Sequence, residues 1–199
     1  ISTNKINAAN LLEKVLVYGE EAITGVVDVI VASCCKVGDD DSTRRQIRSM
    51  LGLVGRHVYP ADYLPMILPR LTGEVWVDPA LYTQSIRVLT WMLAGTVDES
   101  ILAPHMDHIM KCFDTINLAS SVSGDEMFEG LQLLQVLCKV CPEECCMRGI
   151  TIFTMVAQLR ATLEFSDDTV ARKNELISEA GQTIHVLATT LGCGAETLS

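Results

Sequence analysis

Apolar residues recur along this chain at spacings of three and four, which is the spacing of one face of a helix. The pattern is clearest between Arg45 and Val58, and it returns three times, at intervals of 39, about 45 and about 50 residues. The four stripes are Ile47, Met50, Leu51, Val54 and Val58; Tyr82, Ile86, Leu89 and Leu93; Met127, Leu131, Leu134, Cys138 and Cys141; and Ile177, Ile184, Leu187 and Leu191. Each stripe predicts a helix with one buried face, and Ile86 and Leu89 are expected in the core.

Further apolar stripes between these segments predict partner helices. Three partners are expected at about Ala61–Leu71, Glu99–Ile116 and Glu144–Phe165, and two more helices near the start at Ala8–Tyr18 and Glu21–Lys36. The partner stripes are Leu64, Ile67, Leu68 and Leu71; Ile101, Leu102, Ile109, Met110 and Phe113; and Ile152, Phe153, Val156, Leu159 and Leu163.

Turn residues separate the predicted helices. Residues that cap helix N-termini stand at Asp39-Asp40-Asp41-Ser42, Asp78-Pro79, Ser123-Gly124-Asp125 and Ser166-Asp167-Asp168. Helix ends are indicated at Gly95, Pro142 and Gly192. A helix–turn–helix unit every 39 to 50 residues is the period of HEAT and armadillo repeats. We therefore predict an all-α fold, an α-solenoid of four to five antiparallel helix pairs that forms a single unit over residues 1–199.

One segment resembles a HEAT repeat in detail. It consists of YLPMILPRL (Tyr63–Leu71), the Asp78-Pro79 turn and SIRVLTWML (Ser85–Leu93). Arg48 and Arg87 fall at the arginine position of that family, whereas Gln132 replaces it in the third repeat. The resemblance implies a binding scaffold, because solenoids function through their extended surfaces.

A longer stretch resembles a narrower family. DDDSTRRQIRSMLGLVGRHVYPADYLPMILPRL (Asp39–Leu71) is similar to the C-terminal part of HEAT-repeat dynein axonemal assembly factors. This resemblance implies a cytoplasmic factor that helps to pre-assemble dynein arms for motile cilia, alongside chaperones. The competing scaffold classes are a tubulin-binding array, a phosphatase scaffold and a transport adaptor.

The composition narrows the range of partners. The chain is 49% hydrophobic and 5% aromatic, with a formal net charge of −10 and no basic run, which argues against nucleic acid and favours a protein with a basic surface. Solubility alone is the other interpretation of this charge. The longest apolar run, Gly25–Cys35, is interrupted by Asp28 and is too short to cross a membrane. The chain begins with Ile1 and shows no signal peptide, so we expect a piece of a longer protein.

Eight cysteines suggest a reducing cytoplasm rather than a disulfide scaffold. Four of them, Cys138, Cys141, Cys145 and Cys146, form C-x-x-C-x-x-x-C-C, and four thiolates could bind zinc. Core packing is the favoured interpretation, because Cys138 and Cys141 continue a helical stripe. Cys34, Cys35 and Cys193 lie near predicted helix ends. We expect all eight thiols to be free, with no metal and no cofactor.

Catalytic patterns are missing from the sequence. His105 and His108 lack the spacing of a zinc-protease helix, and no phosphate-binding glycine motif occurs. Gly52 and Gly55 are predicted to let a neighbouring helix approach closely. An enzyme is therefore not expected.

The candidate partner surface is acidic, with one tryptophan. It comprises Asp39, Asp40, Asp41, Glu74, Trp76 and Asp78. Trp76 stands in a loop between Val75 and Val77, where it is expected to fold back onto the core as a lid. The alternative is an exposed binding anchor. For the acidic loop Gly38–Asp41, solvated helix capping is the favoured interpretation, and a contribution to the partner surface is the alternative.

Overall fold

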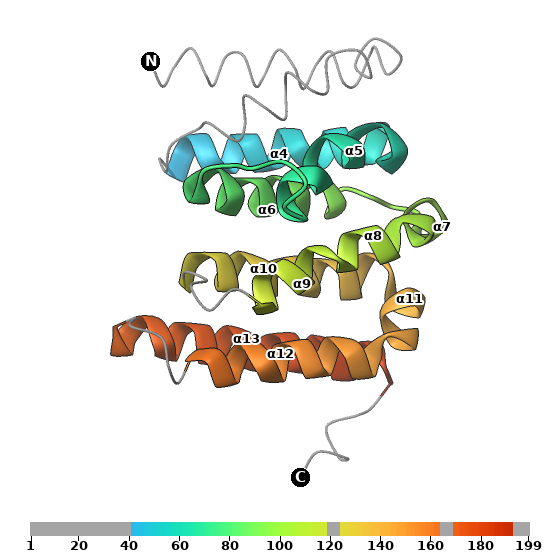
Figure 1. Ribbon diagram of the computed structural model, residues 1–199. Coiled ribbons are helices and arrows are strands. Elements are labelled where there is room, and N and C mark those ends of the chain that lie inside the picture. Colours follow the sequence, from blue (N-terminus) through green and yellow to red (C-terminus); the bar gives the residue numbers. More distant parts are fainter. Residues whose placement is uncertain (1–40, 119–123, 164–168, 193–199) are drawn as a thin grey trace. The chain divides into compact units, whose positions relative to one another are not determined.

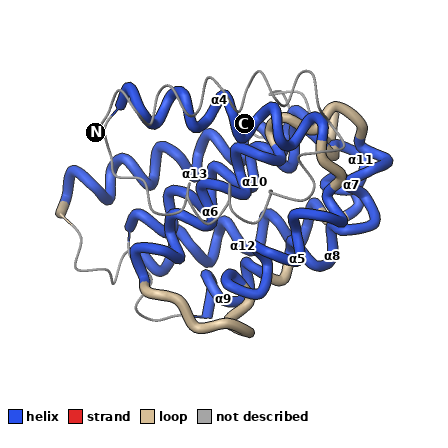
Figure 2. The backbone as a smooth tube through the Cα atoms, turned by 90° about the horizontal axis from the view of Figure 1, so that it is seen from above, coloured by secondary structure: helices blue, strands red, loops and turns tan. Residues whose placement is uncertain are grey.

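A computed structural model describes residues 41–118, 124–163 and 169–192, which form helices and connecting turns with no strand among them (Figure 1). Figure 2 likewise colours each described element as helix or loop. The predicted all-α class is confirmed. The predicted helices Ala8–Tyr18 and Glu21–Lys36 lie outside the described residues. Contacts divide the chain into two compact units, unit 1 (Ile1–His105) and unit 2 (Met106–Ser199). The single array over residues 1–199 stays a prediction.

The described part of unit 1, residues 41–105, contains three long helices and a short C-terminal segment. They are α4 (Asp41–His57), α5 (Pro60–Leu71), α6 (Pro79–Leu93), α7 (Glu99–Leu102) and the 3-10 turn η2 (Ala103–His105). Both α4 and α5 pack against α6. The side chain of Asp78 caps α6 by accepting a hydrogen bond from the Ala80 backbone N–H at 2.9 Å, and Pro79 follows at the first helical position.

The core of unit 1 follows the predicted stripes. Most stripe residues of α4, α5 and α6 are buried, whereas Leu68 and Tyr82 are half-buried at the edges. The fully enclosed side chains are Leu51, Val54, Tyr63, Ile67, Leu71, Ile86, Leu89, Met92, Leu93 and Leu102. The spacing of apolar residues along the sequence therefore predicted which face of each of these helices is buried.

Glycines set the distance between α4 and α6. A Cβ atom added to Gly55 would lie 1.7 Å from the backbone oxygen of Met92, and one added to Gly95 would lie 1.8 Å from the backbone oxygen of Gly52. The two helices therefore meet backbone to backbone at their C-terminal halves. The predicted close approach is confirmed, and the structure requires glycine at Gly55 and Gly95. A Cβ added to Gly52 would lie 3.9 Å from the Trp91 backbone oxygen, so there it is the Gly52 backbone that makes the close contact.

The described residues of unit 2 form three short helices and three long ones. They are α8 (Met106–Met110), α9 (Cys112–Leu118), α10 (Gly124–Val140), α11 (Pro142–Met147), α12 (Gly149–Leu163) and α13 (Val170–Thr190). The longest contact surface joins α10 to α13, and α12 packs on α13 and on α9. No described helix combines the length and the hydropathy that a bilayer crossing requires.

Two predicted partner helices are broken in the structure. The single helix expected at Glu99–Ile116 is divided into α7, η2, α8 and α9, and Pro104 stands inside the 3-10 turn. Proline has no backbone N–H to donate and clashes with the preceding turn, so it interrupts an α-helix. The helix expected at Glu144–Phe165 is similarly divided at Arg148 into α11 and α12. The Arg148 guanidinium forms ion pairs with Glu144 and, at 2.7 Å, with Asp107. The hydrogen bond from Arg148 and its positive charge hold the pKa of the Asp107 carboxyl below its ordinary value.

The predicted stripe of α13 is confirmed as buried only at Leu187, because Ile184 and Leu191 are half-buried and Ile177 is exposed. Ile177 is 41% exposed, and the buried face instead consists of Leu176, Glu179, Ala180, Thr183 and Leu187. Gln135 on α10 explains this choice, because its side-chain amide donates to the Glu179 carboxylate at 2.6 Å and to the Thr183 hydroxyl at 3.1 Å. Gln132 donates to the same carboxylate. Buried polar groups are stable when they are hydrogen-bonded across an interface. The face that carries Glu179 and Thr183 is therefore buried, and the face that carries Ile177 is exposed.

Phe153 on α12 is also misassigned. It was expected in the core, but half of its surface is exposed, together with Ile150 beside it. The buried residues of α12 are Ile152, Met155, Val156, Leu159 and Leu163. No charged residue occurs between Gly149 and Leu159, so α12 is apolar on both sides and its sequence does not single out one buried stripe.

Candidate functional site

The loop between α5 and α6 presents Trp76 to solvent. The side chain is 85% exposed, and the neighbouring Val75 is half exposed. The expectation that Trp76 folds back as a lid is therefore wrong, and the alternative of an exposed anchor agrees with the structure. Tryptophan is enriched among the residues that dominate the binding energy of protein interfaces. This loop is the candidate binding site of unit 1.

The backbone around Trp76 is held in place by hydrogen bonds. The Val75 N–H donates to the Pro69 carbonyl at 2.9 Å, and the Thr72 N–H and hydroxyl both donate to the Leu68 carbonyl, at 2.8 and 3.1 Å. Gly73 adopts a φ of +78°, a left-handed conformation that glycine reaches without strain and that turns the chain out of α5. The exposed indole thus projects from an anchored turn.

Two exposed carboxylates flank the indole in sequence. The Glu74 carboxylate lies 3.2 Å from the Thr72 hydroxyl and shares the single proton of that hydroxyl with the Leu68 carbonyl, and Asp78 caps α6 as described above. The structure therefore brings Glu74, Trp76 and Asp78 together on one short loop. Of the other predicted surface residues, Asp41 is the first residue of α4, and Asp39 and Asp40 lie outside the described residues.

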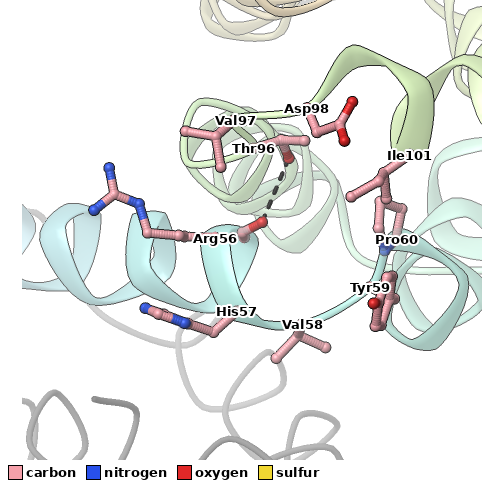
Figure 3. A pocket seen from close by; sticks show the side chains of 10 residues that line it. Arg56, His57, Val58, Tyr59, Pro60, Thr96, Val97, Asp98 and Ile101 are labelled. Atoms are coloured by element: carbon pink, nitrogen blue, oxygen red, sulfur yellow. Dashed lines mark hydrogen bonds between the residues drawn. The ribbon is translucent and has the colours of Figure 1, made fainter.

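A shallow cleft, which the sequence did not indicate, lies at the other end of α6 (Figure 3). It has a volume of about 220 Å³ and is formed by the turn from α4 to α5 and by the segment that follows α6. The Thr96 hydroxyl joins its two walls by donating to the Gly55 carbonyl at 3.5 Å. Figure 3 shows Arg56 and His57 on one side and Tyr59 and Ile101 on the other. Tyr59, which is 66% exposed, could have been flagged by its position in a turn.

The cleft and the Trp76 loop lie on opposite edges of unit 1. They are separated by the length of α6, whose 15 residues span about 22 Å at 1.5 Å per residue. The loop offers a projecting aromatic ring with two negative charges, and the cleft offers a small hollow with both signs of charge. The two features are therefore separate surfaces, and either can serve as a control for the other.

The cysteine cluster of unit 2 is divided between the interior and the surface. Cys138, Cys141 and Cys145 are buried, and Cys146 is exposed. A hydrogen bond to Cys138 raises the pKa of the Cys145 thiol, and burial raises it further. Within the described ranges, no group of three or more His, Cys, Asp or Glu side chains is arranged to hold a metal ion.

This division predicts different thiol reactivities. Burial raises the pKa of Cys112 to about 12, so its thiolate fraction at pH 7 is roughly 10⁻⁵. In native protein, Cys146 is expected to react with a maleimide within minutes, while Cys112, Cys138 and Cys145 react only after unfolding. Peptide mapping by mass spectrometry assigns each adduct, and Cys146→Ser is the control that removes the rapid one. Equal labelling of Cys145 and Cys146 in native protein would contradict the described packing.

A family model, dynein axonemal assembly factor 5, HEAT-repeat domain, matches residues 1–163. The match covers 163 of the 199 residues and includes α4 to α12. The chain belongs to this family. Searches among curated proteins and among solved structures found no match. The helices α5 and α6 make up the segment that resembles a HEAT repeat and pack against each other, so the Trp76 loop connects the two helices of that segment, and the cleft lies at its other end.

Proposed function

We propose that this HEAT-repeat chain is a non-catalytic scaffold that binds protein partners during the cytoplasmic pre-assembly of axonemal dynein arms. Membership of the assembly-factor family supports the process. Trp76 is the single observation that supports a binding role, because a large apolar side chain is held in solvent on an anchored loop. Burying such a ring in an interface releases roughly 2–3 kcal/mol of hydrophobic free energy.

The proposed partner surface consists of Asp39, Asp40, Asp41, Glu74, Trp76 and Asp78. The helices α4 and α6 pack against each other and run in the same direction (Figure 1). Their N-termini, at Asp41 and Asp78, therefore lie at the same edge of unit 1. An acidic edge on a chain of net charge −10 favours a partner with a basic surface.

The acidic character of this edge also favours the assembly-factor role over a tubulin-binding array. Tubulin-binding arrays would place basic and aromatic residues in the turns within their repeats. Here Trp76 supplies the aromatic residue, but its flanking residues Glu74 and Asp78 are negatively charged. The charge of the turn thus favours basic partners, and association should weaken as added salt shortens the Debye length from about 8 Å at physiological ionic strength.

Trp76→Ala tests the proposed surface. In ciliated cells that depend on the variant protein, we expect co-purification of dynein heavy chains to fall about tenfold, because loss of an aromatic anchor commonly costs more than 1 kcal/mol of binding energy. Tyr59→Ala removes another exposed aromatic ring, on the opposite edge, and is expected to leave co-purification unchanged. Normal ciliary beating and intact dynein arms after complete loss of the protein would contradict the proposed function.

A further inference from the structure

Unit 2 contains an arginine held by one aromatic ring and two carboxylates. The guanidinium carbon of Arg172 lies 5.3 Å from the centre of the Phe128 ring. The same guanidinium forms ion pairs with Asp125 and Glu175. Stacking and charge pairing act on different parts of the cation, because the ring attracts its face and the carboxylates accept its N–H groups.

The α5–α6 loop of unit 1 offers the same three groups to solvent. Trp76 supplies the ring, and Glu74 and Asp78 supply the carboxylates. Within the part of the chain that the structure describes, no cation lies over the Trp76 ring. Trp is a better cation acceptor than Phe, since its ring system carries the larger negative face.

We propose that Trp76 receives the cationic head of an arginine side chain from a partner protein, between the Glu74 and Asp78 carboxylates. This inference rests on the proposed function, since it specifies what the partner places on that loop. An uncharged apolar side chain fits the site less well, because its approach would remove water from two carboxylates without pairing them. Arginine fits better than lysine, since a planar guanidinium stacks on an indole while its edge remains available to carboxylates.

The binding test uses the two tryptophans of the chain as reporters. A peptide of alternating glycine and arginine is titrated into ¹⁵N-labelled protein, and the same peptide with citrulline in place of arginine is the uncharged control of similar shape. The indole N–H signal of Trp76, assigned with Trp76→Phe, is expected to shift, while that of the half-buried Trp91 stays in place. The arginine peptide is expected to bind about tenfold more tightly than the citrulline peptide.

Substitutions then divide the contributions of the ring and the carboxylates. Trp76→Leu keeps an apolar side chain and is expected to weaken arginine-peptide binding about threefold. The double variant Glu74→Gln/Asp78→Asn keeps a capping residue before α6 and is expected to weaken binding about tenfold. Tyr59→Leu/Asp98→Asn, which changes an exposed ring and a capping acid on the opposite edge, is the matched control and should bind as the unaltered chain does.

The outcomes separate this inference from the proposed function. Equal binding of the arginine and citrulline peptides, or unchanged binding by Trp76→Leu, would overturn the inference. If Trp76→Ala still lowered co-purification of dynein heavy chains in that case, the proposed function would stand with an apolar contact at Trp76. Arginine-selective binding with unchanged co-purification would instead support the recognition chemistry and contradict the proposed function.

Discussion

Replacing Gly55 by alanine is expected to destabilise unit 1 by about 3 kcal/mol, near the upper end of the cost of overpacking a core. The added Cβ would lie 1.7 Å from the Met92 backbone oxygen, a distance that no rotamer change can relieve because both atoms belong to the backbone or are fixed to it. The helices α4 and α6 would have to separate, and the side chains packed between them would lose contacts along the whole interface.

Urea denaturation followed by circular dichroism measures this effect, because both compact units are helical and both contribute to the signal. Gly181→Ala is the matched control. Gly181 is inside α13 with no atom within 4 Å of an added Cβ, so alanine should stabilise that helix by roughly 0.5–1 kcal/mol. A Gly55→Ala variant as stable as the unaltered chain would show that α4 and α6 are farther apart than described.

Replacing Ile86 by alanine is expected to destabilise the protein by roughly 2–5 kcal/mol. Ile86 is fully buried on α6, in the most regular of the repeats, so truncation removes apolar contacts and leaves a cavity. The spread of the estimate reflects how far neighbouring side chains can relax into that cavity. Because the interior of a solenoid is shared by successive helices, the loss should be felt by α4 and α5 as well as α6.

Thermal and urea unfolding followed by circular dichroism provide the measurement. Ile150→Ala makes the same chemical change at a side chain that is 87% exposed on α12, and it should alter stability by less than about 0.5 kcal/mol. A loss below about 0.5 kcal/mol for Ile86→Ala would place this face of α6 in solvent and would contradict the register of the repeat.

The helices and most of their buried faces could be predicted from the sequence. The stripe of α6, its cap at Asp78 and its proline at the first position are local signals, because hydrophobic spacing and capping depend on residues within one or two turns. Two glycines one turn apart, Gly52 and Gly55, likewise indicated a close helix contact. The break at Pro104 was also a local signal, and it should have outweighed the apolar stripe on either side.

Only the tertiary structure decided which side of α13 is buried. Glu179 and Thr183 appear polar in sequence, and their burial depends on Gln135, which is 44 and 48 residues away and reaches them across the α10–α13 interface. The exposure of Trp76 is likewise decided by the packing of helices and not by the residues next to it in the sequence. A tryptophan between two valines suits a lid as well as an anchor, and the choice depends on whether the packed helices leave a gap for it. Because α4 and α6 meet closely through glycines and the apolar side chains of α5 fill the core beside them, the ring stays in solvent, where a partner can reach it.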